Sequence, residues 1–311
     1  MTTRLYENPI FLEHNTPEGH PERADRLRSL NIALNHPNFS GLERREAQQA
    51  NEDAVMLAHP EEHFIAVMRQ VPEEEDQINQ LEADTYASQK SLQCALTAIG
   101  GAMAAVDDVM TGAADNVFVA GRPPGHHAEK TKAMGFCLFN TVAIAARHAQ
   151  QAYGVERVAI VDWDVHHGNG TQDIFWDDSS VLFCSTHQMP LYPWTGKKDE
   201  VGPHKTIVNA PLSANSGSDH FREAFKSRVL PALHDFAPDL ILISAGFDAH
   251  HRDPLAQINL VGEDFDWATG RLMEVADRFA KNRVVSLLEG GYDLEGLAES
   301  AGMHILRLMK G

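Results

Sequence analysis

The 311-residue sequence has few cysteines and no long apolar run, and these two absences exclude several classes of protein. Its three cysteines, Cys94, Cys137 and Cys184, lie far apart, so they form neither a disulfide framework nor a CxxC pair. The most apolar run, residues 240–243, is much shorter than the ~18 residues that span a bilayer. No apolar segment follows the early Arg4, so a secretion signal is not predicted and a reducing, cytoplasmic setting is expected.

Basic residues are also scarce. Lys and Arg together number 26 against 44 Asp and Glu, which gives a formal net charge of −18. Nucleic acids and anionic membranes attract proteins that present a basic face, so neither is expected as a partner. The acidic surplus is compatible with a cationic substrate, although most acidic proteins are simply soluble.

Short apolar runs alternate with helical patterns over the last two thirds of the chain. The apolar runs are residues 117–120, 158–161, 181–184, 207–208, 240–243 and 284–288. Helices are expected at 140–153, 218–234, 263–280 and from 294 onward. The first third is expected to be mostly helical, at 22–35, 51–70 and 88–110, with a surface loop at 72–84. This alternation predicts βαβ units and a parallel sheet covered by helices on both faces.

Polar residues and glycines follow four of the apolar runs directly. These segments read GRPPGHH after 117–120, DWDVHHGNG after 158–161, SAGFD after 240–243 and EGGY after 284–288. Ligands of open α/β sheets bind at the carboxyl ends of the strands. The four segments are therefore expected to build one site.

The second segment carries a candidate metal-binding pattern. Asp162, Asp164 and His166 are spaced i, i+2 and i+4, so an extended chain places them on one face. Two of them together with Asp248 would supply three ligands and leave a position for water, as in catalytic zinc sites. Asp162 is either a ligand or a carboxylate that orients a histidine. An Asp-x-His pair alone is also typical of a solvated turn, and the three other polar segments favour the metal site.

Two further features suggest catalysis. The tandem His126-His127 could supply a general base and a charged partner beside a metal-bound water, although a lone histidine is usually structural. Tyr292 could donate its hydroxyl to a developing oxyanion, whereas a packed loop tyrosine is the alternative. Of the pair at 166–167 only the first histidine is assigned to the metal, and the pair at 250–251 is expected to be structural.

In combination, RPPGHH, DWDVHHGNGTQ, SAGFDAHHRDPL and LLEGGYD resemble the zinc-dependent histone deacetylase family. The resemblance is closest to class II members and to bacterial histone-deacetylase-like amidohydrolases, and it extends from about Glu18 to the last helix. It implies the arginase–deacetylase fold, a single α/β catalytic domain over residues 1–311. The sheet of that domain is central, mainly eight-stranded and parallel, and helices flank it.

The resemblance also implies residue roles. One catalytic zinc ion would be held by Asp164, His166 and Asp248. The catalytic residues would be His126, His127, Tyr292, Asp162 and Asn169. Asp162 matches the partner of His126, and Asn169 matches the partner of His127, where class I enzymes carry Asp. A structural monovalent cation, usually potassium, would be bound at Asp162, Asp164, His166, Ser185 and Thr186.

The same resemblance implies a substrate channel lined by Gly135, Phe136, Tyr192, Leu255 and the rim carboxylate Asp84. Tyr192 stands where phenylalanine is usual. Arg23 matches an internal arginine near the base of the site.

The implied reaction is hydrolysis of the amide of an acylated amine, with N6-acetyl-lysine as the first expectation. His127 is then the general base and His126 its electrostatic partner. An arginase-type enzyme would need a further carboxylate at Gly168. An acetylpolyamine amidohydrolase remains the alternative, although Leu255 stands where polyamine-selective eukaryotic relatives carry glutamate. A non-catalytic acyl-binding protein would be expected to lack a metal ligand or Tyr292, and all of these residues are present. Homo-oligomerisation is left open.

Overall fold

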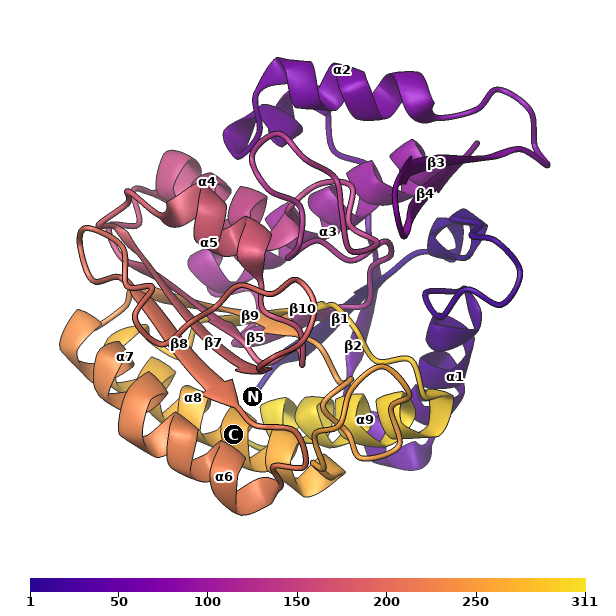
Figure 1. The fold of residues 1–311 in the computed structure, drawn as a ribbon. Coiled ribbons are helices and arrows are strands. Elements are labelled where there is room, and N and C mark those ends of the chain that lie inside the picture. The colour runs from indigo at the N-terminus through magenta and orange to yellow at the C-terminus, as the bar shows by residue number, and fades with distance from the viewer.

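The computed structural model describes residues 1–311 and contains one eight-stranded sheet between layers of helices (Figure 1). The strand order is β2-β1-β5-β10-β9-β6-β7-β8, and every neighbouring pair is parallel. The strands are β1 (Thr3–Glu7), β2 (Glu43–Glu46), β5 (Asn116–Val119), β6 (Val158–Asp162), β7 (Val181–Gln188), β8 (Ile207–Leu212), β9 (Leu240–Ala245) and β10 (Val284–Leu288). The expected eight-stranded parallel α/β sheet is confirmed.

Helices cover both faces of this sheet. In Figure 1, α3, α4 and α5 lie on one side and α6, α7, α8 and α9 lie on the other. The α-helices are α1 (Asp25–Leu34), α2 (Glu61–Gln70), α3 (Ser91–Thr111), α4 (Thr141–Tyr153), α5 (Asn169–Phe175), α6 (Ser218–Ala224), α7 (Leu230–Phe236), α8 (Gly262–Phe279) and α9 (Leu294–Lys310). Short 3₁₀ segments are η1 (Pro9–Glu13), η2 (Pro37–Phe39) and η3 (Glu52–Leu57), and η4 (Phe225–Val229) is a π-helical turn.

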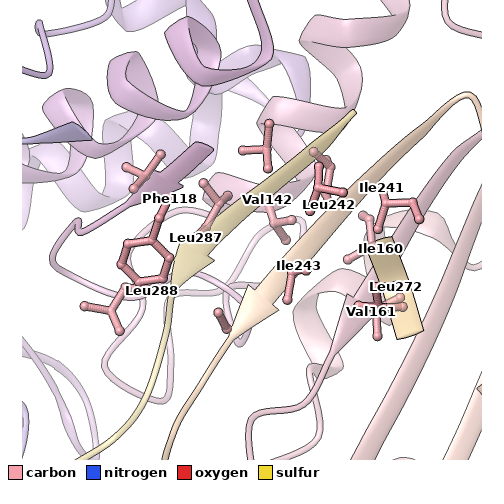
Figure 2. Close-up of a cluster of buried hydrophobic side chains, with 14 of the residues drawn as sticks. Phe118, Val142, Ile160, Val161, Ile241, Leu242, Ile243, Leu272, Leu287 and Leu288 are labelled. Atoms are coloured by element: carbon pink, nitrogen blue, oxygen red, sulfur yellow. The ribbon is translucent and has the colours of Figure 1, made fainter. Parts of the chain in front are cut away.

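The central strands are apolar because both of their faces are covered. Every residue of β5, β6, β9 and β10 is buried. Figure 2 shows part of the resulting core, in which side chains from these strands pack with others from α4 and α8. The labelled members are Phe118, Val142, Ile160, Val161, Ile241, Leu242, Ile243, Leu272, Leu287 and Leu288. Such continuous burial explains why these strands read as apolar runs rather than as alternating patterns.

Helix α3 is the one helix whose length and composition would allow it to cross a membrane. Most of it is buried inside the protein, where it packs against α4, β5 and η1. These contacts are those of a core helix. The three cysteines, one of which lies on α3, are all free and buried.

The three helical stretches expected in the first third are present as α1, as η3 with α2, and as α3, but the prediction missed two strands of the main sheet. Strands β1 and β2 lie there, and β2 is the largely exposed edge strand with the sequence Glu-Arg-Arg-Glu. Its parallel hydrogen bonds to β1 need no apolar face, so it carries no periodic signal. The expected loop at 72–84 contains β3 (Ile78–Glu82), which pairs antiparallel with β4 (Thr85–Ser88).

Several helix boundaries also differ from the prediction. The stretch at 51–70 divides into η3 and α2, because Pro60 occupies the N-cap of α2. The stretch at 218–234 contains the π-helical turn η4 between α6 and α7. The short helix α5, which begins at Asn169 within the polar segment after β6, was not predicted.

Candidate active site

Four polar segments meet at the carboxyl edge of the sheet. They follow β5, β10, β9 and β6, which are consecutive in the strand order. The strands are in parallel register, with Asp162 opposite Ser244 and Leu288 opposite Ala245. The expected convergence of these segments on one edge is confirmed.

Asp164, His166 and Asp248 form a compact group of potential metal ligands. Their donor atoms all lie within 4.8 Å of one another. His166 Nδ1 is 3.1 Å from Asp164 Oδ1 and 3.0 Å from Asp248 Oδ2. Two carboxylates and one imidazole at this spacing could together hold one metal ion.

The charge of this group fits a bound cation. Asp164 and Asp248 are 1 % and 0 % exposed, and the ion pairs of both are with histidines rather than with Lys or Arg. Burying two carboxylates without a permanent cation is costly. Burial and the neighbouring Asp164 carboxylate raise the pKa of Asp248 to about 7. A divalent ion would compensate this excess negative charge, so the residues fit a metal.

Two glycines make room for these carboxylates. A Cβ on Gly246 would lie 2.1 Å from Asp164 Oδ2, and one on Gly290 would lie 2.3 Å from Asp248 Oδ2. The backbone N–H of Gly290 donates to Asp164 Oδ2 at 2.8 Å, and that of Val165 donates to Asp248 Oδ1 at 2.7 Å. Close backbone approach therefore explains the glycines of the SAGFD and EGGY segments.

Hydrogen bonds determine the tautomers of the tandem histidines. His126 Nδ1 lies 2.9 Å from Asp162 Oδ2, a carboxylate that can only accept, so this nitrogen donates. Asn169 donates through Nδ2 to Glu129 Oε1 at 2.7 Å, which turns its Oδ1 toward His127 Nδ1 at 2.8 Å. His127 Nδ1 therefore carries a hydrogen, and its Nε2 is left to accept a proton.

The two histidines have opposite pKa shifts. Burial lowers the pKa of His126, but the Asp162 and Asp164 carboxylates outweigh burial and raise this pKa well above its usual value. Burial and repulsion by His126 and His166 hold the pKa of His127 well below its usual value. A charged His126 next to a neutral His127 is the kind of divided pair that performs acid–base chemistry.

Tyr292 follows the glycines of the last segment. Its backbone N–H donates to Asp253 Oδ2 at 2.7 Å, and its ring packs edge-to-face on Phe136 with centroids 5.7 Å apart. Burial raises the pKa of Tyr292 well above 10, and no side-chain hydrogen bond contributes to that shift. The hydroxyl therefore stays protonated and is available as a donor.

The internal arginine is Arg26 rather than the predicted Arg23. The Arg23 side chain is 50 % exposed, whereas Arg26 is fully buried. Arg26 Nε donates to Gly291 O at 2.6 Å, its guanidinium also hydrogen-bonds Glu289 O, and it lies 4.9 Å from the Tyr292 ring centroid. Arg23 precedes the first turn of α1, so the arginine three residues later faces the interior.

Glu289 is a buried residue of the site to which the sequence assigned no role. Its Oε2 accepts the backbone N–H groups of Gly125 and His126 at 2.7 and 3.1 Å. Burial is the main reason that the pKa of this carboxyl rises to about 7. The side chain thus fixes the backbone that carries the tandem histidines, and its place in the EGGY segment was the only signal for it.

The aromatic residues predicted to line a channel lie near the candidate catalytic side chains, with Tyr192 beside His127 and His166 and Phe136 beside Tyr292. Gly135 and Phe136 both have left-handed backbones, with φ of 57° and 68°. A Cβ on Gly135 would lie 2.3 Å from the His127 ring, which explains the glycine. The Tyr192 ring lies 5.3 Å from the His127 ring and 6.3 Å from the His166 ring, centroid to centroid.

Asp84 and Leu255 lie on loops that are hydrogen-bonded to the segments carrying Phe136 and Tyr292. Asp84 Oδ1 accepts the N–H of Gly135 at 3.2 Å, which joins the β3–β4 turn to the Phe136 wall. The N–H of Leu255 donates to Asp253 Oδ1 at 3.0 Å, and Asp253 Oδ2 holds the backbone of Tyr292. Both residues are partly exposed.

The residues predicted to bind a monovalent cation share one region. Ser185 pairs in register with Asp162, and Thr186 follows Ser185 on β7. The Thr186 hydroxyl is buried and has no hydrogen-bond partner.

In the histidine pair at 250–251, His250 is buried and its Nδ1 accepts the backbone N–H of Arg252 at 3.3 Å, which is a contact within the loop.

Comparison with known proteins identifies the family. Residues 20–308 match the histone deacetylase domain. The chain belongs to the histone deacetylase family. Its structure is similar to the crystal structure of the HDA15 HD domain, with a TM-score of 0.93 and 36 % sequence identity. The alignment covers 99 % of this chain and 88 % of the HDA15 chain.

Curated relatives within the histone deacetylase family carry different substrate names. The histone deacetylase-like amidohydrolase of Pseudomonas aeruginosa is 36 % identical over 94 % of this chain and 77 % of its own length. The human polyamine deacetylase HDAC10 is 39 % identical over 94 % of this chain, which spans only 45 % of that protein. Membership of the histone deacetylase family supports a hydrolase that acts on acylated amines. The relatives' names differ in the amine, so they do not identify which amine this protein uses.

Proposed function

We propose that this protein is a zinc-dependent deacetylase that hydrolyses the amide of N6-acetyl-lysine. The observation that carries the proposal is the placement of the Asp164, His166 and Asp248 donor group beside two histidines of opposite pKa shift. A cation-binding group next to a neutral base is the arrangement that amide hydrolysis by water requires.

Zinc, when bound by these ligands, supplies a Lewis acid for the substrate carbonyl and lowers the pKa of a bound water. His127 accepts the water proton at Nε2, because Asn169 holds its Nδ1 as a donor. The same nitrogen can then return the proton to the leaving amine. His126 stays protonated against Asp162 and stabilises negative charge nearby.

Tyr292 completes the proposed machinery as a hydrogen-bond donor. Its protonated hydroxyl can donate to the substrate oxygen as that oxygen gains negative charge. Arg26 and Asp253 hold the Tyr292 loop from two directions, through Gly291 O and through the Tyr292 N–H. This support limits the freedom of the hydroxyl before substrate arrives.

A lysine side chain suits the entrance better than a polyamine. Phe136 and Tyr192 offer apolar ring surface to a butyl stem, and Leu255 places no charge on its loop. A polyamine carries further ammonium groups that would need carboxylates along the channel. The main competing proposal is an acetylpolyamine amidohydrolase, which the human relative's name favours. We further propose a structural potassium ion at Asp162, Asp164, His166, Ser185 and Thr186, supported by the unpaired Thr186 hydroxyl.

A substrate panel on zinc-loaded protein tests the proposal. Acetyl-lysine peptides, acetylspermidine and acetylputrescine are compared by kcat/KM, and bound metal is measured by mass spectrometry. We expect one zinc per chain and a preference for the peptides. A preference for acetylpolyamines would replace lysine by polyamine as the substrate. No turnover of any acylated amine by zinc-loaded protein would overturn the enzymatic assignment.

A further inference from the structure

We propose that His167 is a positioning residue that seats the loop carrying Tyr192. The Tyr192 loop is defined as residues 189–200, which follow β7. The proposal rests on the proposed deacetylase function only where it concerns substrate binding. The contact itself is independent of the reaction.

The Tyr192 loop needs an anchor because every one of its residues except Gly196 is at least partly exposed. Trp194, the second residue after Tyr192, is 68 % exposed and has a left-handed backbone, with φ of 68°. Lys197 and Lys198 are also exposed, whereas Gly196 is buried. The loop therefore meets the protein interior near Gly196, four residues after the ring that faces His127.

Gly196 packs directly against the side chains of His167 and His187. The His167 Nδ1 atom lies 2.8 Å from Thr195 Oγ1, and His187 Nε2 lies 2.9 Å from Gly196 O. A Cβ on Gly196 would lie 2.5 Å from His187 Nε2 and 2.6 Å from the His167 ring. The fit is close enough that residue 196 must be glycine, which its φ of 87° also favours.

A hydrogen-bond chain determines how His167 contributes. Gln172 donates through Nε2 to Glu200 Oε2 at 2.9 Å, so its Oε1 faces His167 Nε2 at 3.0 Å and must accept. His167 Nδ1 is then the unprotonated nitrogen and accepts from the Thr195 hydroxyl. Glu200 Oε2 also accepts the N–H of Gly196 at 3.0 Å, which closes the chain on the loop.

The position of His167 in the sequence links this anchor to the metal-binding group. His167 directly follows His166, and the Tyr192 ring faces His166 across 6.3 Å. The Tyr192 loop is thus anchored to the same short segment, residues 166–167, that supplies a potential metal ligand. Through Thr195 and Gly196, His167 sets where Tyr192 stands relative to the reacting atoms.

The substitution Thr195→Val tests the anchor because it removes one hydroxyl and keeps the shape. The matched control is Thr269→Val, which removes a buried Thr–His contact of the same kind, Thr269 Oγ1 to His304 Nδ1 at 2.6 Å. The control contact joins α8 to α9, away from the Tyr192 loop. Both variants are studied as full-length, zinc-loaded protein.

Two measurements are made on each variant. Trypsin cleavage after Lys197 and Lys198 reports opening of the loop, and we expect Thr195→Val to be cut about two- to tenfold faster than wild type. Steady-state kinetics with an acetyl-lysine peptide should show KM raised by a similar factor and kcat nearly unchanged, since a channel wall contributes uniform binding. Thr269→Val should lower thermal stability without changing either value.

Three results would overturn the anchor. The first is that trypsin cuts Thr195→Val no faster than wild type. The second is that trypsin cuts Thr269→Val as fast as Thr195→Val. The third is that Thr195→Val shows a lower kcat at an unchanged KM. If no acylated amine is turned over by wild type, the proposed function fails, and the trypsin comparison alone then decides the anchor. Faster cleavage confined to Thr195→Val would still support it.

Discussion

Removal of the Tyr292 hydroxyl should separate catalysis from folding. Tyr292→Phe keeps the ring that packs on Phe136 and lies under the Arg26 guanidinium, centroid distances being 5.7 and 4.9 Å. The hydroxyl contributes no side-chain hydrogen bond to the protein, so the free energy of unfolding should change by about 0.5 kcal/mol or less. If this hydroxyl stabilises the developing oxyanion, its loss should reduce kcat about 10²- to 10³-fold, or roughly 3–4 kcal/mol.

The assay is steady-state hydrolysis of an acetyl-lysine peptide by protein of measured zinc content. Zinc per chain and the urea unfolding midpoint serve as controls, because Tyr292 lies outside the donor group. The loss should appear in kcat and kcat/KM alike, as expected for a contact made only in the transition state. Turnover within about threefold of wild type would refute the donor role and leave Tyr292 as a packed loop residue.

Three other predictions address the metal, the entrance and the core. Asp248→Asn removes one of two buried carboxylates, so bound zinc and activity should both fall by more than about tenfold, and full zinc with full turnover would remove Asp248 from the ligands. Leu255→Glu places a carboxylate where the chain has an uncharged side chain, so the ratio of kcat/KM for acetylspermidine to that for acetyl-lysine peptide should rise about fivefold, and an unchanged ratio would place Leu255 away from the substrate. Burial lowers the pKa of His304 to about 3, so folded protein keeps it neutral while the unfolded chain binds a proton below about pH 6.5. Wild type should therefore lose about 3 kcal/mol of stability relative to His304→Gln between about pH 7.5 and about pH 4.5, and a constant difference in urea unfolding would contradict this.

The sequence was most informative where burial was greatest. The strands β5, β6, β9 and β10 are covered on both faces, so they appear as apolar runs whose ends mark the carboxyl edge of the sheet. The polar residues of the site follow those ends directly, which is why Asp164, His166 and Asp248 could be grouped before any geometry was known. Strand β2 gave no comparable signal, because an exposed edge strand is held by backbone hydrogen bonds and tolerates charged side chains.

The residues that support the site were harder to predict, because their partners are mostly backbone atoms. Arg26 donates to the carbonyl oxygens of Glu289 and Gly291, and the Glu289 carboxylate accepts the N–H groups of Gly125 and His126. Every residue of a chain carries such atoms, so nothing in the sequence marks which of them an interior arginine or glutamate will meet. Arg23 and Arg26 are separated by one helical turn, and only the start of α1 at Asp25 decides which side chain enters the core. Ligands repeat a chemical pattern that can be read from residue types, whereas their supports depend on which backbone atoms the fold brings near them.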